Sequence, residues 1–251
     1  MAAPPDDPWA DVTALVLCGG LGTRLSPIVA DRPKGLADIG GRPFLDRLLD
    51  QLADAGLGRA FLCTGHMAAS IRTACGDQHG GMTLDYSAED RPLGTAGALR
   101  LALPRVATRN VLVLNGDSYC HVDLRGFHAT YLAATRKPAI VLVEVPDAAR
   151  FGRVECDAEG FVRRFSEKSS ESSPGVINAG IYLLPTDLLR TIPEGRAVSL
   201  EREIFPVWLS SGLRGYRCDG PFIDIGTPES YDEAARFFAG ASGGGGEHAG
   251  N

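Results

Sequence analysis

The stretch LCGGLGTRLSPIVADRPKG, residues 17–35, decides the fold because it joins a buried strand to a glycine-rich loop. The apolar run VTALVL, residues 12–17, precedes the loop and is typical of a strand covered on both faces of a parallel sheet. Ligands of such sheets bind where the strands end. The backbone amides of residues 19–23, the guanidinium of Arg24 and the ammonium of Lys34 suit a phosphate chain.

Two common phosphate-binding motifs do not fit this loop. The dinucleotide fingerprint G-x-G-x-x-G can use Gly20 and Gly22, but its third glycine position is Leu25. A Walker A loop needs Ser or Thr after its lysine, whereas Lys34 is followed by Gly35. The glycines alone would also fit a simple tight turn, and it is the added Arg24 and Lys34 that favour anion binding.

Apolar runs and amphipathic segments alternate along the chain. We predict strands at residues 12–17, 59–65, 82–87, 110–118 and 139–145, and helices at 43–56, 66–75, 95–103 and 227–238. This alternation implies crossover connections and an α/β fold with a single-domain, Rossmann-like, mixed but mainly parallel sheet flanked by helices. A hairpin over 152–165, turning at Asp157–Gly160, and strands at 175–184 and 221–226 are expected to frame a second half of the cleft, where a small β subregion would cover the sugar site.

The length of 251 residues suits one catalytic domain, which we place at residues 11–239. Residues 1–10 and the glycine-rich tail 240–251 carry no pattern that could bury side chains, so both are expected to be flexible. Neither a signal peptide nor an apolar run of about 20 residues is visible. Six cysteines without a CxxC pair indicate reduced thiols. We therefore expect a cytoplasmic protein.

A net charge of -6 argues against nucleic acid or an anionic membrane as a partner. The five histidines show no metal-ligand spacing, and only His66 lies where a strand is expected to end at a ligand site. A homodimer is the default expectation for the assembly.

Two aspartates follow or lie within apolar strands. Asp117 comes after VLVLNG, where Gly116 and Asp117 could also form a simple turn, and Asp224 lies in PFIDIG. An isolated carboxylate in such a strand is unfavourable unless it is paired or binds a metal. Mg²⁺ commonly binds one or two carboxylates together with phosphate oxygens, which predicts a site at Asp117 and Asp224. Asp123 and Asp219 are predicted to be surface caps.

The chain resembles the sugar-1-phosphate nucleotidylyltransferases in an ordered set of motifs. After the loop at 17–35 come PLGTAGAL, NGDS, FGRVE, FSEK, NAGIYL and FIDIGTPESY, so that the resemblance covers residues 12–238. It implies the nucleotide-diphospho-sugar transferase fold. Within the family the chain looks most like the short D-glycero-D-manno-heptose 1-phosphate guanylyltransferases.

The resemblance implies roles for individual residues. Arg24, Lys34 and Asp117 would be catalytic, and Asp117 with Asp224 would bind Mg²⁺. Nucleotide binding is expected from Leu17, Gly19, Gly20, Gly22, Thr23, His66, Pro92, Gly94, Thr95 and Gly116. The sugar phosphate is expected to meet Gly152, Glu167, Lys168, Asn178 and Gly180.

Some of these residues also have local interpretations. Lys168 and Glu167 could be a solvated pair, and Thr95 could cap the helix that starts there, with free amides around it. Asn178 is a polar amide in an apolar strand and needs a partner, which a sugar hydroxyl would supply. Gly152 and Gly180 would permit close approach of the backbone to a ligand.

The implied reaction is attack of a sugar 1-phosphate on the α-phosphorus of a nucleoside triphosphate. GTP and D-glycero-D-manno-heptose 1-phosphate are favoured by the branch that the chain resembles. Alternatives are mannose-1-phosphate guanylyltransferase, N-acetylmuramate-1-phosphate uridylyltransferase, heptose-1-phosphate adenylyltransferase and a regulatory nucleotide-sugar-binding paralogue. The paralogue would be expected to lack Arg24, Lys34 or one of the aspartates, and all are present. Leu25 argues against a nicotinamide-dependent oxidoreductase.

Overall fold

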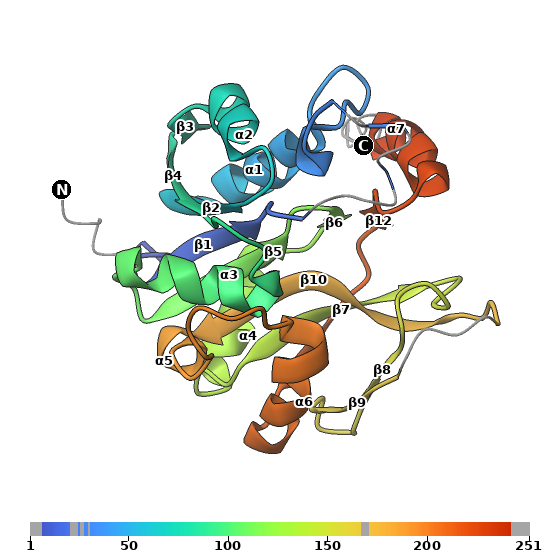
Figure 1. Ribbon diagram of the computed structural model, residues 1–251. Coiled ribbons are helices and arrows are strands. Elements are labelled where there is room, and N and C mark those ends of the chain that lie inside the picture. Colours follow the sequence, from blue (N-terminus) through green and yellow to red (C-terminus); the bar gives the residue numbers. More distant parts are fainter. Residues whose placement is uncertain (1–6, 21–24, 26–27, 30, 167–170, 242–251) are drawn as a thin grey trace, which may run out of the picture.

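A mixed sheet, eight-stranded within the described residues, forms the centre of the computed structural model, which describes residues 7–20, 25, 28–29, 31–166 and 171–241 (Figure 1). In spatial order its strands are β11 (Arg214–Cys218), β7 (Ala139–Val145), β10 (Gly175–Pro185), β5 (Asn110–Asn115), β1 (Val12–Leu17), β2 (Arg59–Thr64), β4 (Met82–Ala88) and β3 (Gln78–His79). The pairs of β1 with β5 and β2, of β2 with β4 and of β7 with β11 are parallel. Only β10 and the short β3 run antiparallel to their neighbours, so the predicted mainly parallel α/β sheet is confirmed.

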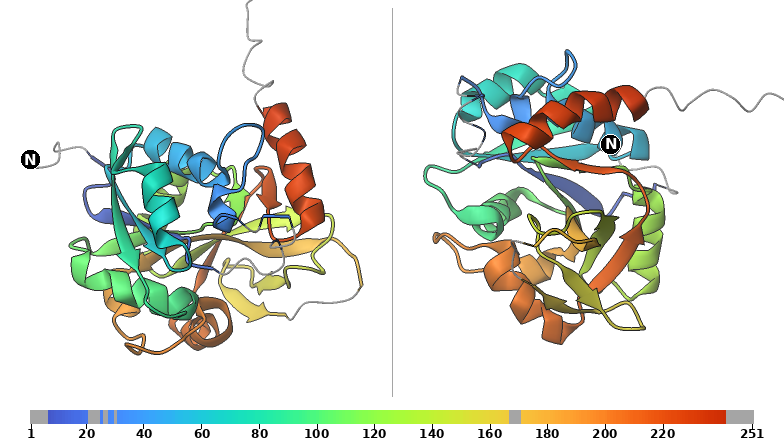
Figure 2. Two further views of the ribbon diagram at one scale, coloured as in Figure 1. Left: turned by 45° about the horizontal axis from the view of Figure 1, so that its top comes forward. Right: turned by 90° about the vertical axis from the view of Figure 1, so that its right-hand side faces the viewer.

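Helices cover both faces of this sheet (Figures 1 and 2). One face packs against α1 (Phe44–Ala55), α2 (Ala68–Cys75), α4 (Leu124–Ala133) and α7 (Pro228–Ala241). The other packs against α3 (Gly94–Ala102), α5 (Thr186–Leu189) and α6 (Phe205–Trp208). Short helical turns lie at Lys34–Leu36, Leu103–Arg105 and Leu209–Ser211, and a π-helical turn, η3, spans Leu200–Ile204. The sheet is therefore the middle layer of three.

The side chains of β1 show how the sequence specifies these layers. Ala14 and Val16 belong to the core on the α1 side, whereas Leu15 belongs to the core on the α3 side. Alternation along a strand sends neighbouring residues to opposite faces, so a continuous apolar run is needed where both faces are covered. In α1 the leucines at helical spacing are fully buried, and each contributes about 1.5–3 kcal/mol relative to an exposed side chain.

Two small strand pairs stand beside the main sheet at the cleft. The strand predicted at 110–118 is in fact two strands, because β5 ends at Asn115 and β6 (Ser118–Cys120) pairs antiparallel with β12 (Phe222–Asp224). The hairpin of β8 (Val154–Cys156) and β9 (Val162–Phe165) turns where predicted, and Gly160 N donates to Asp157 O at 3.1 Å. The break after Asn115 leaves Asp117 at the carboxyl edge of the sheet.

The amino-terminal segment corrects one expectation. Trp9 is only 3% exposed, its ring stacks on His128, and its Nε1 donates to Ala55 O at 2.8 Å. The prediction that residues 1–10 bury nothing is therefore wrong at Trp9, while residues 1–6 and 242–251 lie outside the described residues. The last helix begins as predicted, with Thr227 Oγ1 accepting from Ser230 N, and continues to Ala241. Across the described ranges, no helix combines the length and the apolar character that a membrane span requires.

Candidate active site

A cleft of about 640 Å³ opens beyond the end of β5. Its walls come from segments that are distant in sequence: the turn after β5, the loop before β8, the end of β9, the middle of β10, the start of η3, and β12. The carboxyl edge of a mainly parallel sheet is where α/β proteins collect ligands, so this cleft is the candidate active site.

Asp117 and Asp224 both line this cleft although 107 positions separate them. Asp224 pairs with Ser118 in the β6–β12 register, and Ile225 N donates to Asp117 O at 2.9 Å. The two carboxylates therefore come from directly adjacent backbone segments, as the sequence predicted. Among the described residues, no cluster of three or more His, Cys, Asp or Glu side chains could hold a metal.

Each of the two carboxylates has a cationic partner. Lys34 Nζ lies 2.8 Å from Asp117 Oδ2, and the lysine side chain is 13% exposed. Arg150 Nη2 lies 3.0 Å from Asp224 Oδ1. A Cβ added to Gly226 would overlap Asp224 Oδ2 and lie 3.7 Å from Lys34 Nζ, so Lys34, paired with Asp117, also lies near the backbone segment of Asp224. Sequence reasoning missed Arg150, which lies in a polar loop without a periodic pattern.

The donor set of this pair suits a hard divalent cation. Asp117 Oδ1 has no hydrogen-bond partner within the described part of the chain, and the Asp117 side chain is 49% exposed to the cleft. Asp224 Oδ2 accepts from Gly226 N at 2.9 Å, which fixes that carboxylate. Mg²⁺ prefers oxygen ligands and usually retains substrate oxygens and water in the remaining positions, which two protein carboxylates allow.

Near Gly19, which was expected to bind the nucleotide, lies a carboxylate that the sequence did not single out. A Cβ built on Gly19 would lie 3.0 Å from Glu89 Oε1, and one built on Gly65 would lie 2.6 Å from it. Glu89 Oε2 accepts from Leu93 N at 2.9 Å. Burial raises the pKa of Glu89 above its usual value. Its place three residues before the motif PLGTAGAL was the available signal.

The loop at Pro92–Gly97 differs from its prediction. Thr95 does not cap α3, because its Oγ1 accepts from Leu200 N at 2.7 Å and donates to Glu201 Oε2 at 2.9 Å. The amides of Ala96 and Gly97 donate to Val198 O, so they are not free either. Hydrogen bonds thus hold the Pro92–Gly97 loop against the segment that leads into η3.

Gly116, which was also expected to bind the nucleotide, lies against Leu17, whose O accepts from Gly116 N at 3.0 Å.

Of the residues expected to bind the sugar phosphate, Asn178 and Gly180 already have protein partners. Asn178 Nδ2 donates to Tyr182 OH at 2.9 Å, and Asn178 Oδ1 accepts from Gly180 N at 2.8 Å. Gly180 has a φ of 78°, and a Cβ there would lie 2.7 Å from Ser118 Oγ. Asn178 therefore does not need a sugar hydroxyl as its partner, and the backbone conformation of Gly180 accounts for the glycine there. Asn178 lines the cleft, so sugar binding at these two residues stays a prediction. Gly152, with a φ of 81°, does line the cleft.

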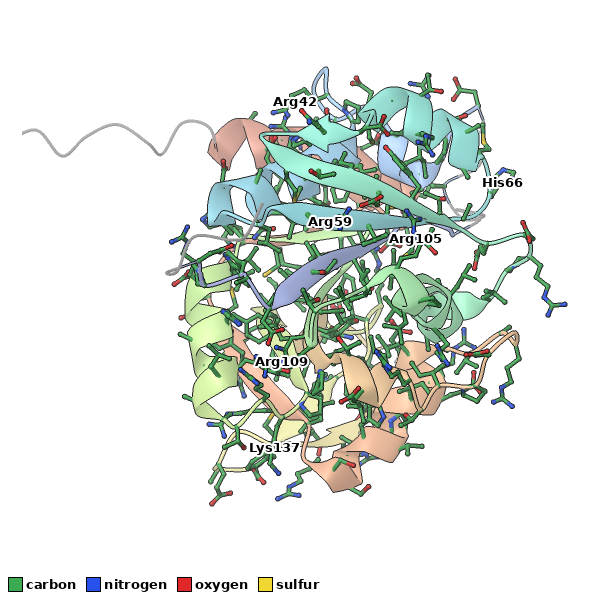
Figure 3. The ribbon with its side chains drawn as sticks, turned by 90° about the vertical axis from the view of Figure 1, so that its left-hand side faces the viewer. Arg42, Arg59, His66, Arg105, Arg109 and Lys137 are labelled. Carbon is green, nitrogen blue, oxygen red and sulfur yellow. The ribbon has the colours of Figure 1, made fainter. Side chains whose placement is uncertain are left out.

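Other predicted site residues lie at the surface or outside the described ranges. His66 is exposed at the turn after β2 (Figure 3), and Gly20 and Pro92 are exposed as well. Several cations on the face in Figure 3 pair with carboxylates, Arg59 and Arg105 with Asp85 among them. The residues outside the described ranges are Gly22, Thr23, Arg24, Glu167 and Lys168.

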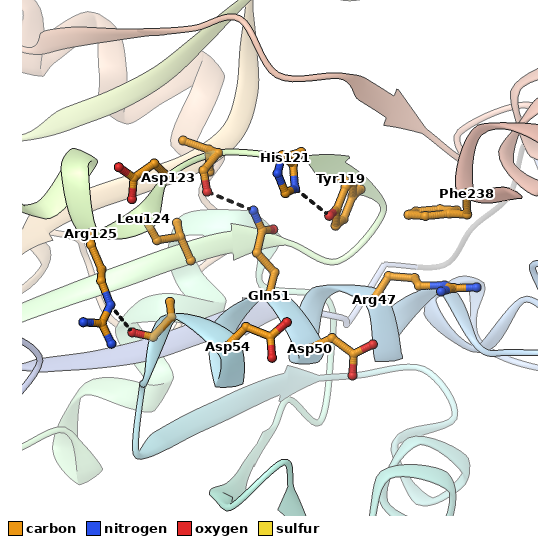
Figure 4. Close-up of a pocket in the computed structure, with 12 residues that line it drawn as sticks. Arg47, Asp50, Gln51, Asp54, Tyr119, His121, Asp123, Leu124, Arg125 and Phe238 are labelled. Carbon is orange, nitrogen blue, oxygen red and sulfur yellow. Dashed lines mark hydrogen bonds between the residues drawn. The ribbon is translucent and has the colours of Figure 1, made fainter. Parts of the chain in front are cut away.

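A second hollow, of about 540 Å³, lies between α1, β6 and α7 (Figure 4). Gln51 Nε2 donates to Cys120 O at 2.8 Å across it. Asp123, which lines it, accepts from Gly126 N and caps α4 as predicted. Asp219, by contrast, is exposed between β11 and β12 and begins no helix, so the cap predicted there is wrong. No predicted catalytic or metal-binding residue lies in this hollow.

Comparison with known proteins places the cleft in a family context. A family model described as nucleotidyl transferase matches residues 13–240. The chain is 35% identical over 224 residues to the mannose-1-phosphate guanylyltransferase of Mycobacterium tuberculosis, covering 88% of this chain but 62% of that protein, which is less than two thirds of its length. It is 34% identical over 218 residues to the D-glycero-alpha-D-manno-heptose 1-phosphate guanylyltransferase of Campylobacter jejuni, covering 87% of this chain and 96% of that protein.

Solved structures agree with the sequence matches. HddC from Yersinia pseudotuberculosis, crystallised as a complex with GMP-PN, superposes with a TM-score of 0.81 and 33% identity over 90% of this chain and 99% of that chain. A putative glucose-1-phosphate thymidylyltransferase from Bacillus anthracis superposes with a TM-score of 0.78 and 25% identity over 90% of this chain and 94% of that chain.

Proposed function

Because the chain belongs to the nucleotidyl transferase family, we propose that it is an enzyme that transfers a guanylyl group from GTP to a sugar 1-phosphate, with D-glycero-D-manno-heptose 1-phosphate as the favoured acceptor. The observation that carries the proposal is the convergence of Lys34, Asp117 and Asp224 at one edge of the sheet. The heptose relatives support the acceptor, since the chain matches 96% of their length.

The reaction is an in-line displacement. A phosphate oxygen of the sugar 1-phosphate attacks the α-phosphorus of GTP, the new P–O bond forms, and the bond to pyrophosphate breaks. Lys34, held by Asp117, neutralises charge on the α-phosphate as it develops. Arg24 is proposed to hold the departing phosphates. Mg²⁺, bound by Asp117 and Asp224, would supply neutralisation of the charge on the attacking and departing oxygens.

Glu89 supports guanine as the base. Guanine presents two neighbouring N–H donors on its Watson–Crick edge, and an ionised carboxylate can accept both. Glu89 Oε1 lies beside Gly19 and Gly65, on the side where the resemblance places the base. Glu89→Gln replaces one acceptor by a donor, so we expect the KM for GTP to rise about tenfold or more while the KM for the sugar 1-phosphate stays within about twofold. Asp90→Asn, a change at the adjacent exposed residue, is the control and should leave the KM for GTP unchanged. An unchanged KM for GTP in Glu89→Gln would exclude a role of Glu89 in guanine recognition.

Product identification tests the whole proposal. Four nucleoside triphosphates are incubated with heptose, mannose or N-acetylmuramate 1-phosphate, with and without Mg²⁺, and products are identified by mass spectrometry. We expect GDP-heptose and pyrophosphate, formed only with Mg²⁺. A larger kcat/KM for mannose 1-phosphate would move the acceptor to mannose. Failure to release pyrophosphate from any pair would show a binding protein instead.

Assembly and location are part of the same proposal. We propose a cytoplasmic homodimer, with free small-molecule substrates as its partners. The six free cysteines support a reducing location. Sedimentation analysis of the full chain measures the assembly state, and a monomer at micromolar concentration would contradict the dimer.

A further inference from the structure

Two oxygen acceptors in the wall of the cleft have no protein donor in the described part of the chain. Asn115 Oδ1 is buried and unpartnered, and Asn115 lines the cleft. Glu201 also lines it and is half-buried. Glu201 Oε2 accepts from Thr95 Oγ1 at 2.9 Å and from Ser199 Oγ at 3.1 Å, which leaves Oε1 without a protein donor in those residues. A buried acceptor that lacks a donor is unfavourable unless a ligand or water supplies one.

Hydrogen bonds from the backbone orient the two hydroxyl groups that bind Glu201. Thr95 Oγ1 accepts from Leu200 N at 2.7 Å, and Ser199 Oγ accepts from Arg202 N at 3.2 Å. Each hydroxyl has only one hydrogen, which therefore points at the carboxylate. These contacts fix Glu201 at the start of the π-helical turn η3, a distortion that is frequent at functional sites.

The charge of Glu201 disfavours a phosphate group beside this carboxylate. Among the described residues, no cation forms an ion pair with Glu201, although Arg153 and the adjacent, exposed Arg202 also line the cleft. Phosphate oxygens are acceptors and would be repelled by Glu201, whereas sugar hydroxyl groups donate. Lys34 and Arg150 pair with the aspartates.

We propose that Asn115 and Glu201 form an acceptor pair that binds hydroxyl hydrogens of the sugar in the sugar 1-phosphate, and that Thr95 is a positioning residue for Glu201. This inference rests on the proposed transfer to a sugar 1-phosphate and names the groups that read the sugar. The site then favours a sugar 1-phosphate that carries the hydroxyl group bound by Glu201, and discriminates against an analogue that lacks this hydroxyl group.

Glu201→Gln is a sharp test because it keeps the shape of the side chain. The hydroxyl hydrogens of Thr95 and Ser199 require the glutamine Oε1 in the place of Glu201 Oε2, so the NH₂ group faces the cleft. A pocket acceptor thus becomes a donor. We expect the KM for mannose 1-phosphate and for heptose 1-phosphate to rise about 10-fold to 100-fold, with the KM for GTP within about twofold. Glu233→Gln on α7, an exposed residue outside the cleft, is the control for the loss of one carboxylate.

Variants of Thr95 separate positioning from base recognition. Thr95→Val removes the hydroxyl but keeps the shape, and Thr95→Ser retains the hydroxyl. We expect Thr95→Val to raise the KM for the sugar 1-phosphate by about tenfold and Thr95→Ser to restore it. A rise confined to the KM for GTP would show that Thr95 reads the base, and would overturn the positioning role.

Monodeoxy analogues of mannose 1-phosphate identify the hydroxyl without relying on a variant's folding. Wild-type enzyme should discriminate strongly against one analogue, and Glu201→Gln should lose that discrimination. If the wild type transfers guanylyl groups but Glu201→Gln has an unchanged KM for the sugar 1-phosphate, this inference alone is overturned. The same holds if the wild type uses all monodeoxy analogues equally well. No transfer by the wild type to any sugar 1-phosphate would overturn the proposed function and this inference with it.

Discussion

Replacement of Lys34 by methionine separates catalysis from stability more clearly than any other change at the cleft. The substitution keeps most of the apolar stem and removes the ammonium, which lies 2.8 Å from Asp117 Oδ2. Asp117 is 49% exposed, so water screens the ion pair and its contribution to stability is at most about 1 kcal/mol. For a chain of this size that loss lowers Tm by about 2–4 °C.

The expected effect on turnover is much larger. Lys34 is held by Asp117 before substrate binds, so its charge needs no reorganisation in the transition state. Loss of one such preorganised donor typically lowers kcat by about 10²–10³, which corresponds to about 2.7–4 kcal/mol. The catalytic loss is therefore severalfold larger in free energy than the loss of stability.

Pyrophosphate release at saturating GTP and sugar 1-phosphate measures kcat, and differential scanning fluorimetry measures Tm. Lys137→Met is the matched control, because Lys137 lies over the Phe161 ring on the face shown in Figure 3 and outside the cleft. A kcat within about threefold of wild type, with Lys34→Met folded, would remove Lys34 from the transition state, since even the weakest donor of this kind contributes about 10².

Two further predictions concern stability and pH. Trp9→Ala should destabilise the fold by about 3–5 kcal/mol in urea unfolding, because it empties a buried site and removes the bond to Ala55 O; a loss below about 1 kcal/mol would contradict the packing seen there. Burial raises the pKa of Cys63 from 9.0 to about 12, so in the folded protein this thiol should resist iodoacetamide at pH 8. Between pH 9.0 and about 12 the thiol ionises in the unfolded chain but not in the folded one, so the free energy of unfolding should fall as the pH rises through this range. Rapid alkylation of native protein at Cys63 would contradict this burial.

The features that the sequence predicted well are those set by local periodicity. The apolar run of β1 and the leucines of α1 are spaced for their final environments, so strand, helix and layer follow from short windows. Asp117 and Asp224 were also predictable, because each carboxylate breaks or ends an apolar strand. The long-range pairing of β6 with β12 brings the two aspartates into neighbouring positions. Their expected place at the same edge of the sheet was enough to predict this proximity.

The errors arise where a distant segment supplies a hydrogen-bond partner. Thr95 has the sequence of a helix cap, yet Leu200 and Glu201, more than a hundred positions later, take its hydroxyl. Asn178 was expected to need a ligand, but Tyr182 in the same strand takes its amide hydrogen across a bulge in β10. A local window contains neither competitor, so a local interpretation cannot weigh them.

The residues that sequence reasoning missed are charged and lie outside the strands and the long helices. Glu89, Arg150 and Glu201 each have other charged residues within three positions, so composition does not distinguish a side chain at the cleft from one in solvent. Only the position of each backbone segment relative to the sheet separates them. Charged site residues outside a recognisable motif are therefore the part of an active site that requires a structure.

The distribution of these residues along the cleft favours one kind of small molecule. Lys34 and Arg150 pair with Asp117 and Asp224, and the acceptors Asn115 and Glu201 line the same cleft as these aspartates. Inorganic phosphate offers no hydroxyl donors to the acceptors, and a free sugar offers no anion to the cations. A sugar 1-phosphate satisfies both, because its anionic and hydroxyl-bearing parts are joined at a fixed distance. In the proposed reaction the acceptor binds with its phosphate toward the cations and its hydroxyl groups toward Asn115 and Glu201, which is an orientation that in-line attack on the α-phosphorus can use.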